Sequence, residues 1–463
     1  MRNTFIKLGY VFILLLLGFV NISAKKIDSS ANLFRNGDKV CFIGNSITHD
    51  GDYHSLIYLF YLTRFPELRL DVFNCGISGH DVANTLKRFK SDIAVHHPTV
   101  ATIKLGTNDV NRDLYFNPTP QKDAEKLNAN AFYKTNMKEL VRKLDSIKTN
   151  IIFLTPAYFE DKPRPDKQIV IGLNEAFEQY GQFLDSLRIN YKTSFVDFHF
   201  IMDSISKARQ KSDPNFSLIG SDRVHPSYDG HFVMAYAFLK ALNVSSYISK
   251  TEIDVIRKKV LDTDNCTLSD LDISKNQLSF KLLEKSLPFP VSAYSHDTSL
   301  VPFTKMFNQE VLKIKGLSPD KKYKLSIDTV FVAELTGKQL LRGINLALIP
   351  VVPQVKQAEK VAVLNKKRRL LSAELRYIKL VEYNSLKPDE LLLGKEEKRE
   401  LLTNILKSME GNSWYHYNKK LFTDYIENVD KQDQKIHQLD EYVKEIYRIN
   451  QPVPHHYKLT LIH

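Results

Sequence analysis

Three side chains that together could carry out nucleophilic chemistry stand in two short segments far apart in the chain. Ser46 lies in residues 44–48 (GNSIT), and Asp222 precedes His225 by three residues within 222–226 (DRVHP). On a turn, a carboxylate at this spacing can accept a hydrogen bond from the imidazole and fix its tautomer. The other ring nitrogen can then take a proton from a serine hydroxyl, so this pattern predicts Ser46 as a nucleophile.

Two further segments could supply hydrogen-bond donors to such a site. Residues 74–79 (NCGISG) hold two glycines, which let the backbone turn tightly and let an N–H approach a ligand closely. Residues 106–109 (GTND) hold Asn108, whose side-chain amide is a donor. Each segment has an ordinary alternative: Ser46 or Thr48 can cap a helix, and the other two segments can be plain turns.

The elements around these segments alternate between short apolar runs and longer amphipathic runs, as expected when parallel strands are joined by helices. The pattern predicts an α/β fold, a three-layer sandwich with a parallel sheet. Its strands are expected at 39–43, 70–73, 100–105, 151–154 and 194–196, and its helices at 54–64, 81–90, 124–148, 173–187 and 228–242. The polar segments then fall at carboxyl ends of strands or in loops, where open parallel sheets bind ligands.

The four segments, in this order and at these separations, resemble the SGNH or GDSL-like hydrolases over roughly residues 37–245. That resemblance implies a flavodoxin-like α/β/α sandwich and ester hydrolysis, with Ser46 as nucleophile, His225 as general base and Asp222 orienting the imidazole. It also implies an oxyanion hole made by the backbone N–H groups of Ser46 and Gly79 and the Asn108 side chain, with Gly76 the less favoured donor. One departure is Asn45, where many members carry aspartate. Neither a metal nor an organic cofactor is expected.

The expected activity is a secreted serine hydrolase of carboxylic esters, and deacetylation of a small or polymeric carbohydrate is the favoured reaction. An exported enzyme with an additional β-module resembles other exported sugar esterases, and the chain has no long apolar lid segment. One alternative is a lipase or lysophospholipase of the same family. Another is a non-catalytic glycan-binding protein, against which the complete set of site residues argues.

The N-terminus predicts export. Arg2 and Lys7 precede an apolar run at 8–20 and a small-residue stretch that ends at Ala24, the order of a secretory signal peptide. The apolar run is shorter than the roughly 20 residues that a membrane span needs. We therefore expect cleavage near Ala24, a secreted or periplasmic protein, and no stable membrane span afterwards.

Composition excludes other classes of protein. Three cysteines cannot support a disulfide scaffold, and Cys41, inside an apolar run, is expected to be buried filler. The net charge of +12 is mild for 463 residues, and the basic run 366–369 is expected to be a solvated helix face rather than a nucleic-acid site.

The C-terminal half has a different pattern. We expect one domain at 25–246 and a second unit at 247–463, an antiparallel β-module with strands at 277–282, 309–314, 322–332 and 457–462. Residues 355–447 predict two or three long helices that form a hairpin within or beside it. Trp414, Tyr415 and Tyr417 could form a sugar platform, although burial against the β-module is the favoured prediction. The oligomeric state stays open.

Overall fold

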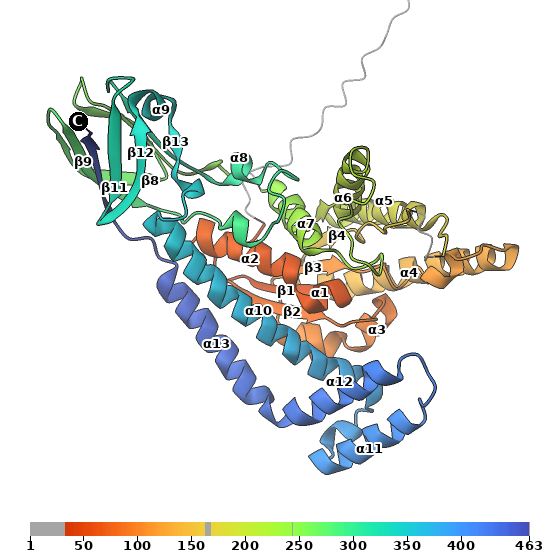
Figure 1. Cartoon of the computed structure of the whole chain (residues 1–463). Coiled ribbons are helices and arrows are strands. Elements are labelled where there is room, and N and C mark those ends of the chain that lie inside the picture. The colour runs from red at the N-terminus through yellow and green to blue at the C-terminus, as the bar shows by residue number, and fades with distance from the viewer. Residues whose placement is uncertain (1–32, 163–167, 243, 463) are drawn as a thin grey trace, which may run out of the picture.

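The computed structural model describes residues 33–162, 168–242 and 244–462 (Figure 1). The predicted signal peptide, residues 1–24, lies outside this part of the chain. Within the described ranges, no helix combines the length and the apolar character that crossing a bilayer requires.

The N-terminal half is built on a five-stranded parallel sheet with the strand order β2-β1-β3-β4-β5. All five predicted strands are confirmed, within a residue or two at most ends. Their bounds are β1 Lys39–Gly44, β2 Asp71–Gly76, β3 Val100–Lys104, β4 Asn150–Leu154 and β5 Ser194–Val196. From β1 the chain first adds β2 on one side and then β3 on the other. The carboxyl ends of β1, β2 and β3 therefore meet at a topological switch point of the sheet.

Helices cover both faces of this sheet, which confirms the three-layer sandwich. One hydrophobic cluster joins the sheet to α2, α6 and α7, and a second joins its other face to α4 and α5. The short helix α1 and the whole of α6 were not predicted, and the helix predicted at 81–90 ends early and continues as a π-helical turn, Phe89–Ile93. The bounds are α1 Ser46–Asp50, α2 Asp52–Arg64, α3 Val82–Lys87, α4 Pro120–Ser146, α5 Leu173–Tyr191, α6 Phe198–Arg209 and α7 Tyr228–Lys240.

Two sheets form the C-terminal β-module, with the orders β13-β10-β6-β7 and β12-β11-β14-β9-β8. Most pairs are antiparallel as expected, but β6 pairs with β10 in parallel. The single strand predicted at 322–332 is wrong: Asp328 adopts φ 52° and turns the chain into a hairpin of two strands. The bounds are β6 Tyr247–Asp254, β7 Lys259–Asp264, β8 Cys266–Ile273, β9 Gln277–Glu284, β10 Gln309–Lys315, β11 Lys322–Ile327, β12 Val330–Thr336, β13 Ile344–Asn345 and β14 His455–Leu461.

A helical layer is inserted between β13 and β14, and it lies along the N-terminal sandwich rather than apart from it (Figure 1). It has four helices, one or two more than predicted, and α10 packs along both α13 and α2. Ala358 and Val361 of α10 belong to the same hydrophobic cluster as α2. The bounds are α8 Phe303–Phe307, α9 Gly337–Arg342, α10 Pro353–Ser385, α11 Lys395–Lys407, α12 Tyr415–Asn428 and α13 Gln432–Ile449, the first two of which precede the insertion.

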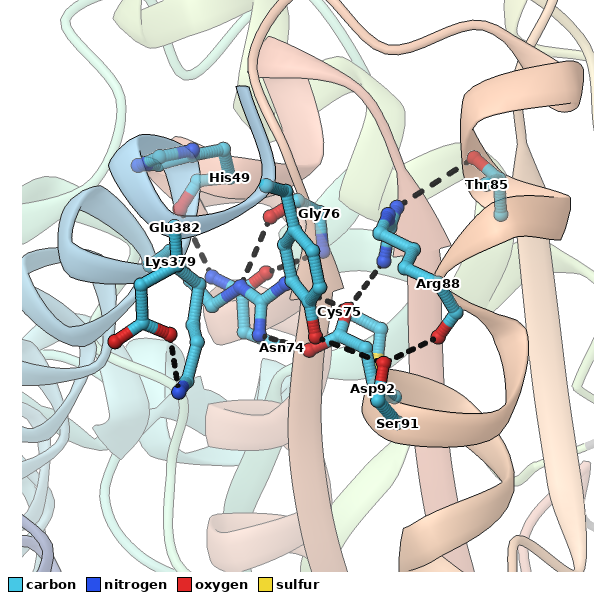
Figure 2. Close-up of polar contacts among 12 residues, drawn as sticks. His49, Asn74, Cys75, Gly76, Thr85, Arg88, Ser91, Asp92, Lys379 and Glu382 are labelled. Atoms are coloured by element: carbon cyan, nitrogen blue, oxygen red, sulfur yellow. Dashed lines mark hydrogen bonds and ion pairs between the residues drawn. The ribbon is translucent and has the colours of Figure 1, made fainter. Parts of the chain in front are cut away.

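A buried ion cluster holds α10 against the parallel sheet (Figure 2). The Arg376 guanidinium donates to both oxygens of the Asp92 carboxylate at 2.7 Å, and its Nε donates to the Gly76 carbonyl at 3.0 Å. Arg88 pairs with the same carboxylate from the other side. Burial opposes ionisation of Asp92, but the two guanidinium groups outweigh it and lower the pKa of this carboxyl. The two halves of the chain are therefore joined by a buried ion cluster, in which the Asp92 carboxylate and the two guanidinium groups compensate each other's charge.

A lysine without a counter-ion lies inside the sandwich. Lys104 is the last residue of β3 and pairs with Gly44 across the sheet, and its side chain is fully buried. Its ammonium group has no hydrogen-bond partner in the described part of the chain. Burial lowers the pKa of Lys104 to about 7, because the charged form loses its hydration and gains nothing in return.

Replacing Lys104 with methionine is expected to stabilise the fold by on the order of a few kcal/mol at pH 7, because one pKa unit corresponds to about 1.4 kcal/mol. The folded pKa lies below the unfolded value of 10.5, so unfolding binds a proton between pH 7 and 10.5. Wild-type stability should therefore rise with pH across this window, and that rise should be smaller in Lys104→Met. Urea unfolding at pH 6 to 10 measures the free energy of unfolding. Lys138→Met, at an exposed position, is the control. An identical pH profile in all three proteins would contradict the lowered pKa of Lys104.

Candidate active site

Ser46 lies at the turn between β1 and α1, as the first residue of that helix. The Asn45 carbonyl accepts hydrogen bonds from the N–H groups of Thr48 and His49 at 3.1 and 2.8 Å, which begins the helix without using the Ser46 hydroxyl. Gly44 is required at the turn, since a Cβ there would come within 2.0 Å of the Thr48 side-chain oxygen. The capping alternative for Ser46 therefore does not describe this structure, and its hydroxyl stays available.

The structure brings Ser46, His225 and Asp222 together in one chain of hydrogen bonds. Ser46 Oγ lies 2.7 Å from His225 Nε2, and His225 Nδ1 bonds the Asp222 carboxylate. A carboxylate can only accept, so Nδ1 carries the proton and Nε2 is left to accept from the serine hydroxyl. This is the arrangement in which a hydroxyl can be deprotonated as it attacks.

The loop that carries Asp222 and His225 is held in place on several sides. The second Asp222 oxygen accepts the N–H groups of Val224 and His225, both at 3.0 Å. Arg223, which directly follows Asp222, adopts φ 68°, a left-handed conformation that is costly for a side chain of this size. Its guanidinium donates to the Glu160 carbonyl, which helps to hold the backbone in that strained shape.

The electrostatics of Asp222 favour its ionised form. Partial burial works against the charge, but the hydrogen bonds from the His225 ring and from the backbone N–H groups of Val224 and His225 outweigh it and lower the pKa of Asp222. An ionised carboxylate at this position stabilises the positive charge that the imidazole gains when it takes the serine proton.

The segments that the sequence singles out hold three candidate hydrogen-bond donors. The backbone N–H groups of Ser46 and Gly79 have no acceptor in the described part of the chain. The Asn108 amide donates one of its two N–H groups to the His80 carbonyl at 2.8 Å, which leaves the other for a ligand. The Gly76 N–H is occupied by the Asn74 side chain at 3.0 Å, so it cannot take this role.

The loops that carry these donors are stabilised by their own polar contacts. Gly79 has φ 80°, a backbone conformation that glycine adopts readily, while a Cβ there would meet no atom within 4 Å. The Asp109 carboxylate accepts the N–H groups of Val82 and Gly106 at 2.8 and 2.9 Å, which ties the loop after β3 to the start of α3. Burial raises the pKa of Asp109 to about 7.

Sequence reasoning missed the contact that C-terminal helix α10 makes beside this site, between its Tyr377 and His49 of α1. His49, three residues after Ser46, accepts the Ser78 N–H on its Nδ1 at 3.2 Å, and its ring lies 4.3 Å from that of Tyr377 on α10. Nothing in the spacing of His49 and Tyr377, over three hundred residues apart, indicates that they touch.

The burial prediction for the aromatic cluster at the start of α12 is wrong for two of its members: Trp414 is 62% exposed and Tyr417 is 45% exposed.

Comparison with known proteins finds relatives of the N-terminal half. Residues 42–232 match the GDSL-like lipase/acylhydrolase family. An acetylxylan esterase of Geobacillus stearothermophilus is 28% identical over 222 residues, which is 45% of this chain and 94% of that protein.

A solved structure extends the likeness to the C-terminal half. A gut microbial diltiazem-metabolizing enzyme superposes with a TM-score of 0.83 at 29% identity, over 93% of this chain and 98% of that one. The β-module and the helical layer are therefore shared with that enzyme. By their sheet, their four polar segments and these relatives, residues 42–232 belong to the SGNH or GDSL-like hydrolase family. The chain is a carboxylic ester hydrolase.

Proposed function

We propose that Ser46, His225 and Asp222 act as a catalytic triad. The Ser46 oxygen attacks the ester carbonyl while His225 Nε2 takes its proton, and Asp222 stabilises the imidazolium. The imidazolium then protonates the leaving alcohol, and a water molecule activated by the same nitrogen releases the acid from Ser46. The observation that carries this proposal is the hydrogen-bond chain from Ser46 through His225 to Asp222.

The negative charge that forms on the carbonyl oxygen would be bound by the N–H groups of Ser46 and Gly79 and by the Asn108 amide. The free state of both backbone donors supports this role, because they need no rearrangement to accept an oxyanion.

The proposed substrate is an acetylated carbohydrate. The likeness to an acetylxylan esterase supports an acetyl group on a sugar as the ester that is cleaved. The half-exposed side chains of His225 and Asp222 also leave room for a bulky alcohol at the site. We further propose that residues 1–24 direct export, so that the enzyme meets its substrate in the periplasm or outside the cell.

Replacing Ser46 with alanine is expected to abolish covalent labelling by a fluorophosphonate probe and release of p-nitrophenol from p-nitrophenyl acetate, because both reactions need the serine oxygen. Intact mass measurement on protein without residues 1–24 locates the adduct. Ser78→Ala serves as the matched control and should label as the wild type does. Labelling that persists in Ser46→Ala would show that another nucleophile acts.

Replacing Asn108 with alanine is expected to lower kcat by roughly 10²- to 10³-fold with a much smaller change in KM, because an oxyanion donor acts mainly in the transition state. Steady-state kinetics on p-nitrophenyl acetate measure both constants. Since Asn108 also bonds the His80 carbonyl, thermal unfolding of the variant is the control for loss of structure. A rise in KM as large as the expected fall in kcat, with kcat itself unchanged, would assign Asn108 to substrate binding instead.

A further inference from the structure

Asp50 stands beside the nucleophile without a role in the triad. It closes the helix α1 that Ser46 begins, so the two side chains are four residues apart and lie on the same face of that helix. Burial raises the pKa of the Asp50 carboxyl, and the His225 imidazole is the neighbouring group that most offsets this effect. Asp50 therefore borders the place where the ester must lie.

The Arg369 charge lowers the pKa of the Asp50 carboxyl, but the two side chains form no direct ion pair. Arg369 of α10 donates to the Asp50 carbonyl at 3.0 Å, but its ion pair is with Asp52, at 3.3 Å. Among the ion pairs of the described ranges, none includes Asp50. The side-chain partner of Asp50 is the Tyr377 hydroxyl, a neutral group.

Helix α10 holds Tyr377 at a defined position. The preceding residue, Arg376, is fixed by Asp92 and by the Gly76 carbonyl. With Arg376 bound in this way, the Tyr377 ring packs on His49, yet 38% of the side chain stays exposed. The ring is thus rigidly placed and accessible, as a binding surface should be.

Helix α12 adds a second exposed ring. Leu421 belongs to the hydrophobic cluster that joins α12 to Ile378 of α10, and Tyr417 lies one helical turn before it on the same face. Burial and the Asp50 carboxylate together raise the pKa of Tyr417, which is consistent with its place beside Tyr377 and Asp50. Trp414 packs edge-on against Tyr417, with ring centroids 5.8 Å apart.

We infer that Asp50, Tyr377 and Tyr417 form a subsite for the alcohol part of the ester, and that this alcohol is a sugar ring. An exposed aromatic face can pack against the C–H face of a pyranose, and an unpaired carboxylate can accept hydrogen bonds from its hydroxyl groups. The C-terminal helical layer then serves substrate choice, while the N-terminal sandwich performs the chemistry. This inference rests on the proposed function.

The test compares two acetyl esters that differ in their alcohol: an acetylated xylooligosaccharide and p-nitrophenyl acetate. In Tyr417→Ala, the ratio of kcat/KM for the sugar ester to that for p-nitrophenyl acetate should fall about tenfold, which corresponds to roughly 1.4 kcal/mol. Tyr417→Phe keeps the ring and should keep the ratio. Tyr191→Ala is the matched control, because that exposed tyrosine lies at the end of α5, next to the opposite edge of the sheet.

Each other outcome has a defined meaning. An unchanged ratio in Tyr417→Ala, or an equal fall in Tyr417→Phe, overturns the stacking role. Acetylcholine tests for a cationic alcohol: a selective loss of activity on this ester, with none on the sugar ester, overturns the sugar assignment. Wild-type enzyme that cleaves p-nitrophenyl acetate through Ser46 but no sugar ester also overturns it, while the triad stands. Absence of any Ser46-dependent hydrolysis would instead refute the proposed function.

Discussion

The carboxylate of Asp92 is buried between two guanidinium groups that come from opposite halves of the chain. Arg88 reaches it from the N-terminal sandwich, and Arg376, 284 residues after Asp92, reaches it from α10. A buried ion of this kind is tolerated only while its partners remain, since an uncompensated charge in the interior is strongly destabilising. The helical layer is thus an integral part of the fold, because removing it would expose apolar surface of α2 and leave Asp92 with one partner.

In the proposed mechanism, this connection also joins the catalytic site to the subsite for the alcohol. The Gly76 carbonyl that accepts from Arg376 ends β2, and the loop that follows carries Gly79, a donor of the proposed oxyanion hole. On the other side of the contact, Tyr377 of α10 and Tyr417 of α12 both interact electrostatically with Asp50. The sandwich places Ser46 at the switch point of a parallel sheet, and α10 of the inserted layer packs against α1, α2 and β2. The diltiazem-metabolizing enzyme, which aligns over 93% of this chain, shares both layers.

Much of the N-terminal half could be predicted from the sequence, because local signals identify it. Short apolar runs define β1 to β5, and Ser46, Gly79, Asn108, Asp222 and His225 stand in segments that follow strands or precede a helix. The errors have physical reasons. Asp328 breaks a continuous strand pattern by a left-handed turn, and the pair of Arg376 with Asp92 arises only from tertiary packing. Exposure of Trp414 and Tyr417 depends on where α12 packs, which helical periodicity does not reveal.

The strand β14 has a consequence for the order in which the protein can fold. It lies between β9 and β11, and the backbone N–H of His456 donates to the side chain of Asp328, 128 positions earlier in the chain. Before β14 is synthesised, β8–β9 and β11–β12 are two separate hairpins with nothing between them, and isolated hairpins are marginal in water. The five-stranded sheet can therefore assemble only after all four inserted helices have left the ribosome. Closing so long a loop makes this a late and slow step, during which the inner edges of both hairpins are open to other chains.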